Sequence, residues 1–224
     1  MVSFVPTPIG NLGDITLRAL EILKEADLIA CEDTRHSGKL LKFYEISKPT
    51  ISLHDHNEKH RGPELASRAA QGTKIAVISD AGTPCLSDPG YRLMQACIEN
   101  DVPYQVLPGA CSITTALVSS GFPPHPFFFG GFLSVKKGKR TKELQRALDR
   151  DHTSIYFESP HRIISTLELL RDLNTKVMVC ITKELTKKFE TIYSGSPPEL
   201  LVLLSDRVPR GELVMLIAPS DYPK

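Results

Sequence analysis

Apolar residues in the first half of the chain follow two alternating patterns. Short runs rich in β-branched residues are separated by longer segments in which apolar positions recur at helical spacing. In one such segment, Leu17, Leu20 and Leu23 fall on one helix face. Thr16 or Asp14 can cap its amino end. Strands separated by helix-length connections predict a parallel sheet, and its five strands are expected at residues 2–6, 27–31, 50–53, 74–79 and 104–108.

The pattern changes after Gly121, where the stretch "GFPPHPFFFGG" cannot form a regular helix because it carries three prolines. We predict a domain boundary near residues 115–125, with one α/β domain at 1–118 and a second at 119–224. In the second half, the run "FETIYSG" has no helix before it. A mixed sheet that contains an antiparallel hairpin is therefore expected there. The predicted fold class is α/β with two α/β domains.

Composition and charge exclude several classes of protein. The chain has 224 residues, with 27 basic and 26 acidic side chains, so any surface that attracts nucleic acid must be local. Five cysteines show no CxxC spacing and are expected to be reduced. The opening residues do not have the pattern of a signal peptide, and the apolar runs are too short to span a bilayer. We expect a soluble cytoplasmic protein.

Common nucleotide-binding motifs are absent. The first loop, "PTPIGNLGD", places glycines only at Gly10 and Gly13, so it lacks the GxGxxG of a dinucleotide site. The "GKR" at Gly138 lacks the other residues of a phosphate-binding P-loop. Unusual loops instead follow four predicted strands: "PTPIGNLGD", "CEDTRHSG", "SDAGTPCLSDPG" and "PGACS". Ligands of open α/β sheets bind at the carboxyl ends of strands. Each glycine alone fits a turn, but their joint placement favours a ligand site.

Five segments, in order, closely resemble one known family: "TPIGNLGDITLRALEILKEADLIACEDTR", "SDAGTPCLSDPGYRL", "LPGACSITTAL", "YFESPHR" and "ELTKKFE". They resemble the tetrapyrrole-methylase superfamily, and within it the ribosomal RNA small subunit methyltransferase I family, from about Pro6 to Ile217. That family methylates a cytidine 2′-hydroxyl in the decoding region of 16S rRNA. The resemblance implies S-adenosylmethionine as the methyl donor, an active site in a cleft between the two domains, and a homodimer.

The resemblance also implies a role for the long loop "SDAGTPCLSDPG", which would lie along the donor while Asp88, Pro89 and Gly90 start the next helix. The residues implied to bind the donor are Pro8, Asp80, Ala81, Gly82, Thr83, Leu86, Pro108, Gly109, Ser112, Phe157 and Leu185.

Methyl transfer to a ribose hydroxyl requires one positioned base but no metal. The catalytic candidates are Glu158 and Glu184, which follow apolar runs, and then Lys183. Asp33, Arg35 and Asp80 are weaker candidates. A helix cap or an ion pair is an equally good interpretation of either glutamate.

Several basic residues are candidates for contacting RNA. Arg35 and Arg162 can bind phosphate through their planar guanidinium groups. A basic segment adds Lys136, Lys137, Lys139 and Arg140. Because such runs are often merely solvated, a solvated helix face is an equally good interpretation of this segment. The loop "HDHNEKHR", from His54 to Arg61, is interpreted as solvated rather than metal-binding, and it can alternatively touch RNA.

Two other functions remain as alternatives. One is a methylase that acts on a small tetrapyrrole, against which the basic segment argues. The other is a non-catalytic RNA-binding assembly factor, against which the intact "SDAGTP" and "ELTK" argue. The favoured hypothesis is a 2′-O-methyltransferase whose partner is 16S rRNA, either free or within the small ribosomal subunit.

Overall fold

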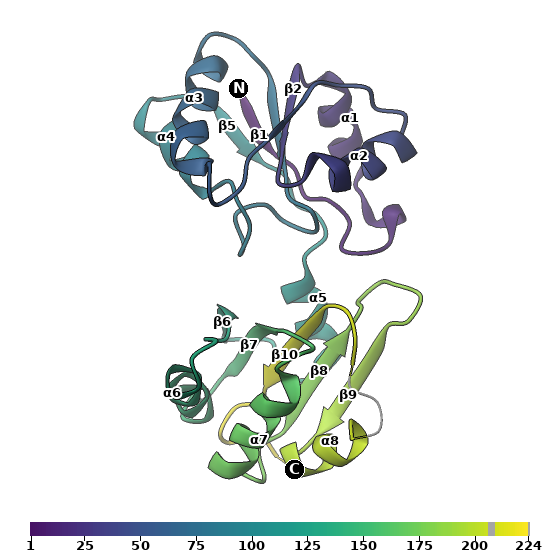
Figure 1. Ribbon diagram of the computed structural model, residues 1–224, viewed down its shortest axis with the longest axis vertical. Coiled ribbons are helices and arrows are strands. Elements are labelled where there is room, and N and C mark those ends of the chain that lie inside the picture. Colours follow the sequence, from purple (N-terminus) through teal and green to yellow (C-terminus); the bar gives the residue numbers. More distant parts are fainter. Residues whose placement is uncertain (206–208, 224) are drawn as a thin grey trace. The chain divides into compact units, whose positions relative to one another are not determined.

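The computed structural model describes residues 1–205 and 209–223. Its chain divides into two compact units, Met1–Cys111 and Ser112–Lys224, called unit 1 and unit 2 below. Each unit contains one five-stranded sheet (Figure 1). The predicted boundary after residue 118 would cut helix α5 (Ser112–Ser120). The whole helix belongs to unit 2 because it packs against strands of that unit's sheet.

Unit 1 is built on a fully parallel sheet, as predicted. Its strands lie in the order β3-β2-β4-β1-β5. Consecutive strands are therefore joined by connections that contain a helix. The carboxyl ends of all five strands lie at the same edge of the sheet. The strands are β1 (Val2–Phe4), β2 (Leu28–Cys31), β3 (Thr50–Ser52), β4 (Ile75–Ile78) and β5 (Tyr104–Val106).

Helices cover both faces of this sheet (Figure 1). One hydrophobic cluster joins α1 and α2 to the sheet, and a second joins α3 and α4 to the opposite side of the strands. Because both faces are buried, the central strands β2 and β4 are apolar throughout. The helical segments are η1 (Leu12–Asp14), α1 (Leu17–Glu25), α2 (Thr34–Phe43), α3 (Glu58–Ala70) and α4 (Tyr91–Glu99).

Helices α2 and α3 both begin within segments that the sequence pattern predicted to be loops. Helix α2 starts at Thr34, because the Asp33 carboxylate accepts a hydrogen bond from the amide of Arg35 and caps it. Helix α3 starts at Glu58 and contains Pro63. Residues 58–61 of the predicted loop His54–Arg61 are therefore helical, which corrects that prediction.

Unit 2 contains the predicted mixed sheet, in the order β6-β7-β10-β8-β9. Strands β6 and β7 are parallel, and the remaining pairs are antiparallel. The run "FETIYSG" supplies β9, which forms the expected hairpin with β8. The strands are β6 (Phe127–Phe132), β7 (Thr153–Glu158), β8 (Val179–Lys183), β9 (Thr191–Gly195) and β10 (Leu213–Ile217).

The helices of unit 2 are α5 to α8. The apolar side chains of α6, α7 and α8 share one core with alternate residues of β8 and β10. Helix α5 packs against β8, β9 and β10. Beyond α5, the helices are α6 (Lys137–Leu148), α7 (Ile163–Leu173) and α8 (Pro197–Leu203). Within the described residues of both units, no helix has the length and apolar character needed to cross a membrane.

Candidate functional site

The loops that follow β1, β4 and β5 are bonded to one another. Thr7 and Gly82 exchange two backbone hydrogen bonds, of 2.9 and 3.0 Å. The buried Thr7 hydroxyl donates to the carbonyl of Ser79 at 3.2 Å. Thr83 donates its hydroxyl to the carbonyl of Ala110, also at 3.2 Å. These bonds join the three loops into one surface at the carboxyl edge of the sheet, called the loop platform below.

Two glycines allow this close approach of the loops. Gly82 has φ of +83°, and a Cβ there would lie 3.2 Å from the side chain of Ile9. At Gly109, a Cβ would lie 2.6 Å from the ring of Pro6. Any larger residue at either position would therefore disturb the platform itself as well as a ligand bound on it.

The long loop after β4 has an unusual backbone in its middle and is fixed by hydrogen bonds at its carboxyl end. Cys85 and Ser87 have φ of +72° and +66°, which is uncommon for residues with a side chain. At its end, Gly90 caps α4. The amides of Gly90 and Arg92 both donate to the buried carboxylate of Glu58, each at 2.8 Å. Glu58 therefore replaces a conventional capping side chain, and the sequence alone gave no sign of this role.

Acidic side chains gather beside the platform, at the ends of β2 and β4. The Asp80 carboxylate accepts a hydrogen bond from the amide of Asp33 at 3.2 Å. Arg35 binds Asp33 through two nitrogens, and this lowers the pKa of Asp33 to about 2. Burial, followed by the charges of Asp80 and Asp55, raises the pKa of Glu32. Arg35 itself is 90% exposed, so it remains open to a phosphate.

The structure brings together most of the predicted donor-binding residues. Eight of them lie on the loop platform, and they are Pro8, Asp80, Ala81, Gly82, Thr83, Leu86, Pro108 and Gly109. Pro8 and Gly82 are buried within the platform, whereas Leu86 is 41% exposed. Ser112, Phe157 and Leu185 belong to unit 2. Phe157 packs between Phe129 and Phe132, with ring centroids 5.0 and 5.3 Å away.

Glu158, the last residue of β7, is fully enclosed. One carboxylate oxygen accepts hydrogen bonds from the amide of Ser159 and the guanidinium of Arg162, both at 2.7 Å. The other accepts from the hydroxyl of Thr166, at 2.7 Å. None of its side-chain surface is exposed. Arg162 also donates to the carbonyl of Leu133, at 3.1 Å. Glu158 thus fixes the start of α7 and the orientation of Arg162.

Glu184 is held less completely, at the end of β8. Its φ is +52°. Its Oε1 accepts hydrogen bonds from Lys187 at 3.0 Å and from the amide of Glu212 at 2.9 Å. Burial by itself would raise the pKa of Glu184, but these two bonds lower it overall. The side chain is 23% exposed, and its neighbour Lys183 is partly exposed.

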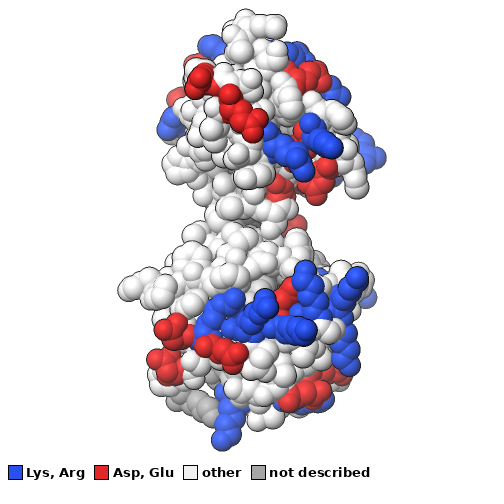
Figure 2. Space-filling view, turned by 90° about the vertical axis from the view of Figure 1, so that its left-hand side faces the viewer, with Lys and Arg blue, Asp and Glu red and all other residues white. Residues whose placement is uncertain are grey.

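The basic segment lies on a solvent-exposed face of unit 2. Lys136, Lys137 and Lys139 are exposed, and Figure 2 shows Lys and Arg side chains gathered in a band on this unit. Arg140 differs, because it is only 6% exposed. Its assignment to RNA together with the lysines therefore stays a prediction, but Arg140 does not share their exposure. It lies on the same face of α6 as Leu144, a helical spacing that would have indicated its burial.

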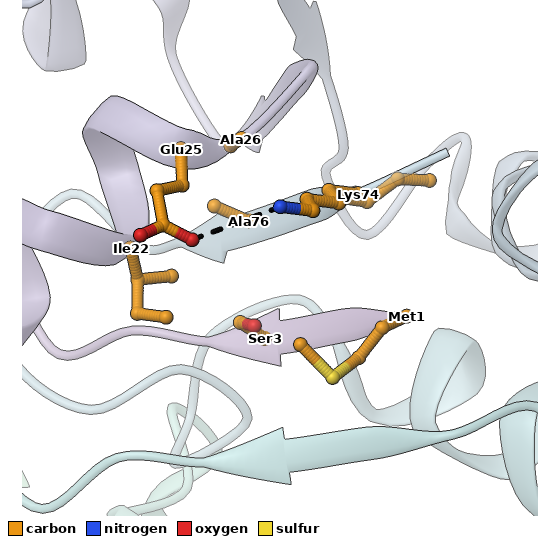
Figure 3. A pocket seen from close by; sticks show the side chains of 8 residues that line it. Met1, Ser3, Ile22, Glu25, Ala26, Lys74 and Ala76 are labelled. Atoms are coloured by element: carbon orange, nitrogen blue, oxygen red, sulfur yellow. Dashed lines mark ion pairs between the residues drawn. The ribbon is translucent and has the colours of Figure 1, made fainter. Parts of the chain in front are cut away.

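Two hollows in unit 1 lie away from the loop platform. The first is a pocket of about 40 Å³ near the amino ends of β1 and β4, where Lys74 points toward Glu25 at 3.7 Å (Figure 3). Pockets for small molecules usually measure roughly 300 to 1,000 Å³, so it is too small for a nucleoside. The second, of about 460 Å³, lies along α2 and is lined by Thr34, Gly38, Leu41, Lys42, Glu45, Ile46, Ser47, Lys48 and Thr50.

The predicted histidine loop forms a turn before α3. The rings of His54 and His56 meet edge to face, with centroids 5.9 Å apart. The side chain of Asn57 lies 3.3 Å from the ring of His54 and accepts the amide of His54 at 3.0 Å. Within residues 1–205 and 209–223, no three His, Cys, Asp or Glu side chains lie together in a way that could hold a metal ion.

Comparison with solved structures identifies the fold. A uroporphyrin-III C-methyltransferase from Thermus thermophilus aligns over 97% of this chain and 93% of its own, with a TM-score of 0.69 and 18% identity. A diphthine synthase aligns over 97% of this chain and 89% of its own, with a TM-score of 0.75 and 14% identity. At such low identities, the likeness concerns the fold alone.

Comparison at the level of sequence identifies the family. The family model of tetrapyrrole (corrin/porphyrin) methylases matches residues 1–201. Ribosomal RNA small subunit methyltransferase I of Vibrio cholerae is 46% identical over 216 residues, which cover 95% of this chain and 75% of that protein. The protein of the same name from Synechocystis is 44% identical, over 98% of this chain and 80% of its own. The chain therefore belongs to the tetrapyrrole methylase family, and within it to the ribosomal RNA small subunit methyltransferase I family.

Proposed function

We propose that this protein transfers a methyl group from S-adenosylmethionine to the ribose 2′-hydroxyl of a cytidine in the decoding region of 16S rRNA. The observation that carries the proposal is the 43–46% identity to several proteins named ribosomal RNA small subunit methyltransferase I, over 95–98% of this chain. We further propose that it works in the cytoplasm as a homodimer, on rRNA in the small ribosomal subunit.

The chemistry of the loop platform suits the donor. The platform presents backbone groups together with small and apolar side chains, among them Ala81 and the exposed Leu86. Such a surface can hold an adenine ring and an aliphatic chain, while Asp80 offers a carboxylate to hydroxyl or ammonium groups. Ser112, Phe157 and Leu185 remain proposed donor contacts. When bound, the sulfonium supplies an electrophilic methyl group, so the protein must position the hydroxyl and remove its proton.

Of the two glutamates, Glu184 is the better candidate for the base. Among the described residues, both oxygens of Glu158 already accept hydrogen bonds. Within the described residues, the side-chain hydrogen bonds of Glu184 all go to Oε1, and its side chain is partly exposed. It is ionised at neutral pH, as a base must be, and its lowered pKa makes it a weaker base than an ordinary glutamate. We assign Glu158 a positioning role through Arg162, and we keep Lys183 as the next candidate.

Methylation of small subunits tests the proposed function. Subunits that lack the modification are incubated with labelled S-adenosylmethionine, and the label is mapped. We expect label on one cytidine ribose of the decoding region. An RNA oligonucleotide of the decoding region can replace the subunit as substrate. In that oligonucleotide, 2′-deoxycytidine at the target position should abolish labelling. Label on a base, or transfer to a tetrapyrrole but not to RNA, would refute the proposal.

Single-turnover rates test the assignment of the base. Glu184→Gln should lower the rate by roughly 10²- to 10⁴-fold with donor and RNA saturating. Glu158→Gln should act mainly through RNA affinity, because Arg162 loses its charged partner. Glu168→Gln, at an exposed position of α7, is the matched control and should leave the rate unchanged. If Glu184→Gln keeps the parental rate across pH 6–9, Glu184 is not the base.

A further inference from the structure

Arg140 is a buried cation that forms no ion pair with the residues that the structure describes. It is only 6% exposed. One terminal nitrogen donates to the hydroxyl of Ser165 at 3.3 Å. Its Nε is buried and, within the described chain, has no hydrogen-bond partner. Among the described residues, no carboxylate oxygen lies within 4.0 Å of its side-chain nitrogens.

This arrangement is unusual because taking a guanidinium out of water carries a large penalty unless an anion accompanies it. The neighbouring Arg162 shows the ordinary solution, since it pairs with Glu158 at 2.7 Å. Ser165 links the two arginines, because its hydroxyl accepts from Arg140 and donates to the carbonyl of Arg162 at 2.8 Å. Within this cluster, one guanidinium has its carboxylate and the other does not.

The amino end of α7 lies against the same guanidinium. Ser165 is in the first turn of this 11-residue helix, whose amino end has no side-chain cap. The first amides of a helix lack partners within the helix, and the helix dipole is positive there. Both properties favour an anion, and the buried carboxylate of Glu158 supplies one on the side of Arg162 and Thr166. Lys136 is exposed one turn away, and its carbonyl accepts the amide of Arg140 at 2.9 Å.

We propose that Arg140, Ser165 and the first turn of α7 form a phosphate-binding site, whose occupant is a phosphodiester of the RNA substrate. An arginine can donate to one phosphate through two nitrogens of its planar guanidinium, and no ion pair among the described residues supplies Arg140 with an anion. The identification of the phosphate as RNA rests on the proposed function. The exposed lysines of the basic segment would then attract the RNA chain around this deeper contact.

Thermal unfolding of the full chain in increasing inorganic phosphate tests the site itself, with chloride keeping the ionic strength constant. A ligand that binds the folded state raises the midpoint as its concentration rises. The parent and Arg146→Met, which removes an exposed arginine of the same helix, should show this rise. Arg140→Met should not. An equal rise in all three proteins would mean an adventitious ion only, and it would overturn the proposal.

Arg140→Lys provides a second test of the site, which is needed if Arg140→Met does not fold. Arg140→Lys keeps the charge but loses the two-pronged donor, so its midpoint should begin to rise only at a phosphate concentration about tenfold higher. A rise identical to that of the parent would overturn the arginine-specific site. Ser165→Ala should weaken the response in the same direction, because the guanidinium loses the hydroxyl that orients it.

RNA binding distinguishes the source of the phosphate. With an unmodified decoding-region oligonucleotide, Arg140→Met should raise the Kd about tenfold or more. This increase should be larger than the increase caused by Arg146→Met. The slope of log affinity against log salt should flatten by about 0.7 to 0.9. If phosphate still protects the parent but the RNA affinity of Arg140→Met is unchanged, the RNA assignment is wrong. If the parent binds RNA without methylating it, only the proposed function fails.

Discussion

At the scale of single residues, the acidic side chains beside the loop platform have opposite environments. Asp33 has Arg35 as a partner, so its pKa falls to about 2. The pKa of Glu32 is instead raised, by burial and by the charges of Asp80 and Asp55. The pKa values of two carboxyl groups that are adjacent in the chain are therefore shifted in opposite directions.

Glu32→Gln should stabilise the protein at neutral pH. Because the pKa of Glu32 is raised in the folded state, the folded protein binds its proton more tightly than the unfolded chain does. Stability therefore falls as pH rises through and above the ordinary value of 4.5. Removing the charge should raise the Tm at pH 7 and change it little at pH 4. A lower Tm at pH 7 would show that the ionised carboxylate makes a net favourable contact.

At the scale of elements, the start of α4 depends on a residue of α3. The buried Glu58 accepts both the Gly90 and Arg92 amides. Glu58→Ala should therefore cost about 1 to 3 kcal/mol in the free energy of unfolding, because two buried donors lose their acceptor. Glu58→Gln keeps one acceptor oxygen and should cost less. Urea denaturation measures both, and equal stability of the alanine variant and the parent would argue against this cap.

The loop before β10 has a similar dependence on a backbone conformation. Gly211 has φ of +94°, and a Cβ there would overlap the carboxylate of Glu184. Gly211→Ala should destabilise by about 1 to 3 kcal/mol and disturb the orientation of Glu184. Gly138→Ala is the control, because nothing lies within 4 Å of a Cβ at this position in α6. It should stabilise by about 0.4 to 1 kcal/mol. If Gly211→Ala and Gly138→Ala shift the denaturant midpoint in the same direction, this account is wrong.

Sequence patterns predicted the elements better than the contacts between them. The apolar runs and the isolated "FETIYSG" were enough to predict a parallel sheet and a mixed sheet, because strand burial determines those patterns. The early start of α3 escaped prediction because Pro63 argued for a later one. The capping by Glu58 could not be predicted, since residues 32 or more positions apart make it. The burial of Arg140 was not predicted, because charge was given more weight than its helical spacing from Leu144.

At the scale of the whole molecule, charge is nearly balanced but is locally concentrated. The net charge is +1, yet Lys136, Lys137 and Lys139 stand together on unit 2. Replacing all three by alanine should weaken RNA binding and flatten its salt dependence, by up to about 0.7 to 0.9 in log-log slope for each lost phosphate contact. Affinity for S-adenosylmethionine should not change. An unaltered slope would mean that these lysines are only solvated.

The loop platform is joined largely by main-chain atoms, and this affects which methods can detect it. The bonds between Thr7 and Gly82 involve no side chain, so replacing Thr7 by alanine removes neither of them. A scan that truncates side chains would therefore not report on these two bonds. Amide hydrogen exchange measures these bonds directly. The amides of Thr7 and Gly82 should exchange slowly without ligand, and a bound donor should slow the neighbouring amides of the loop after β4.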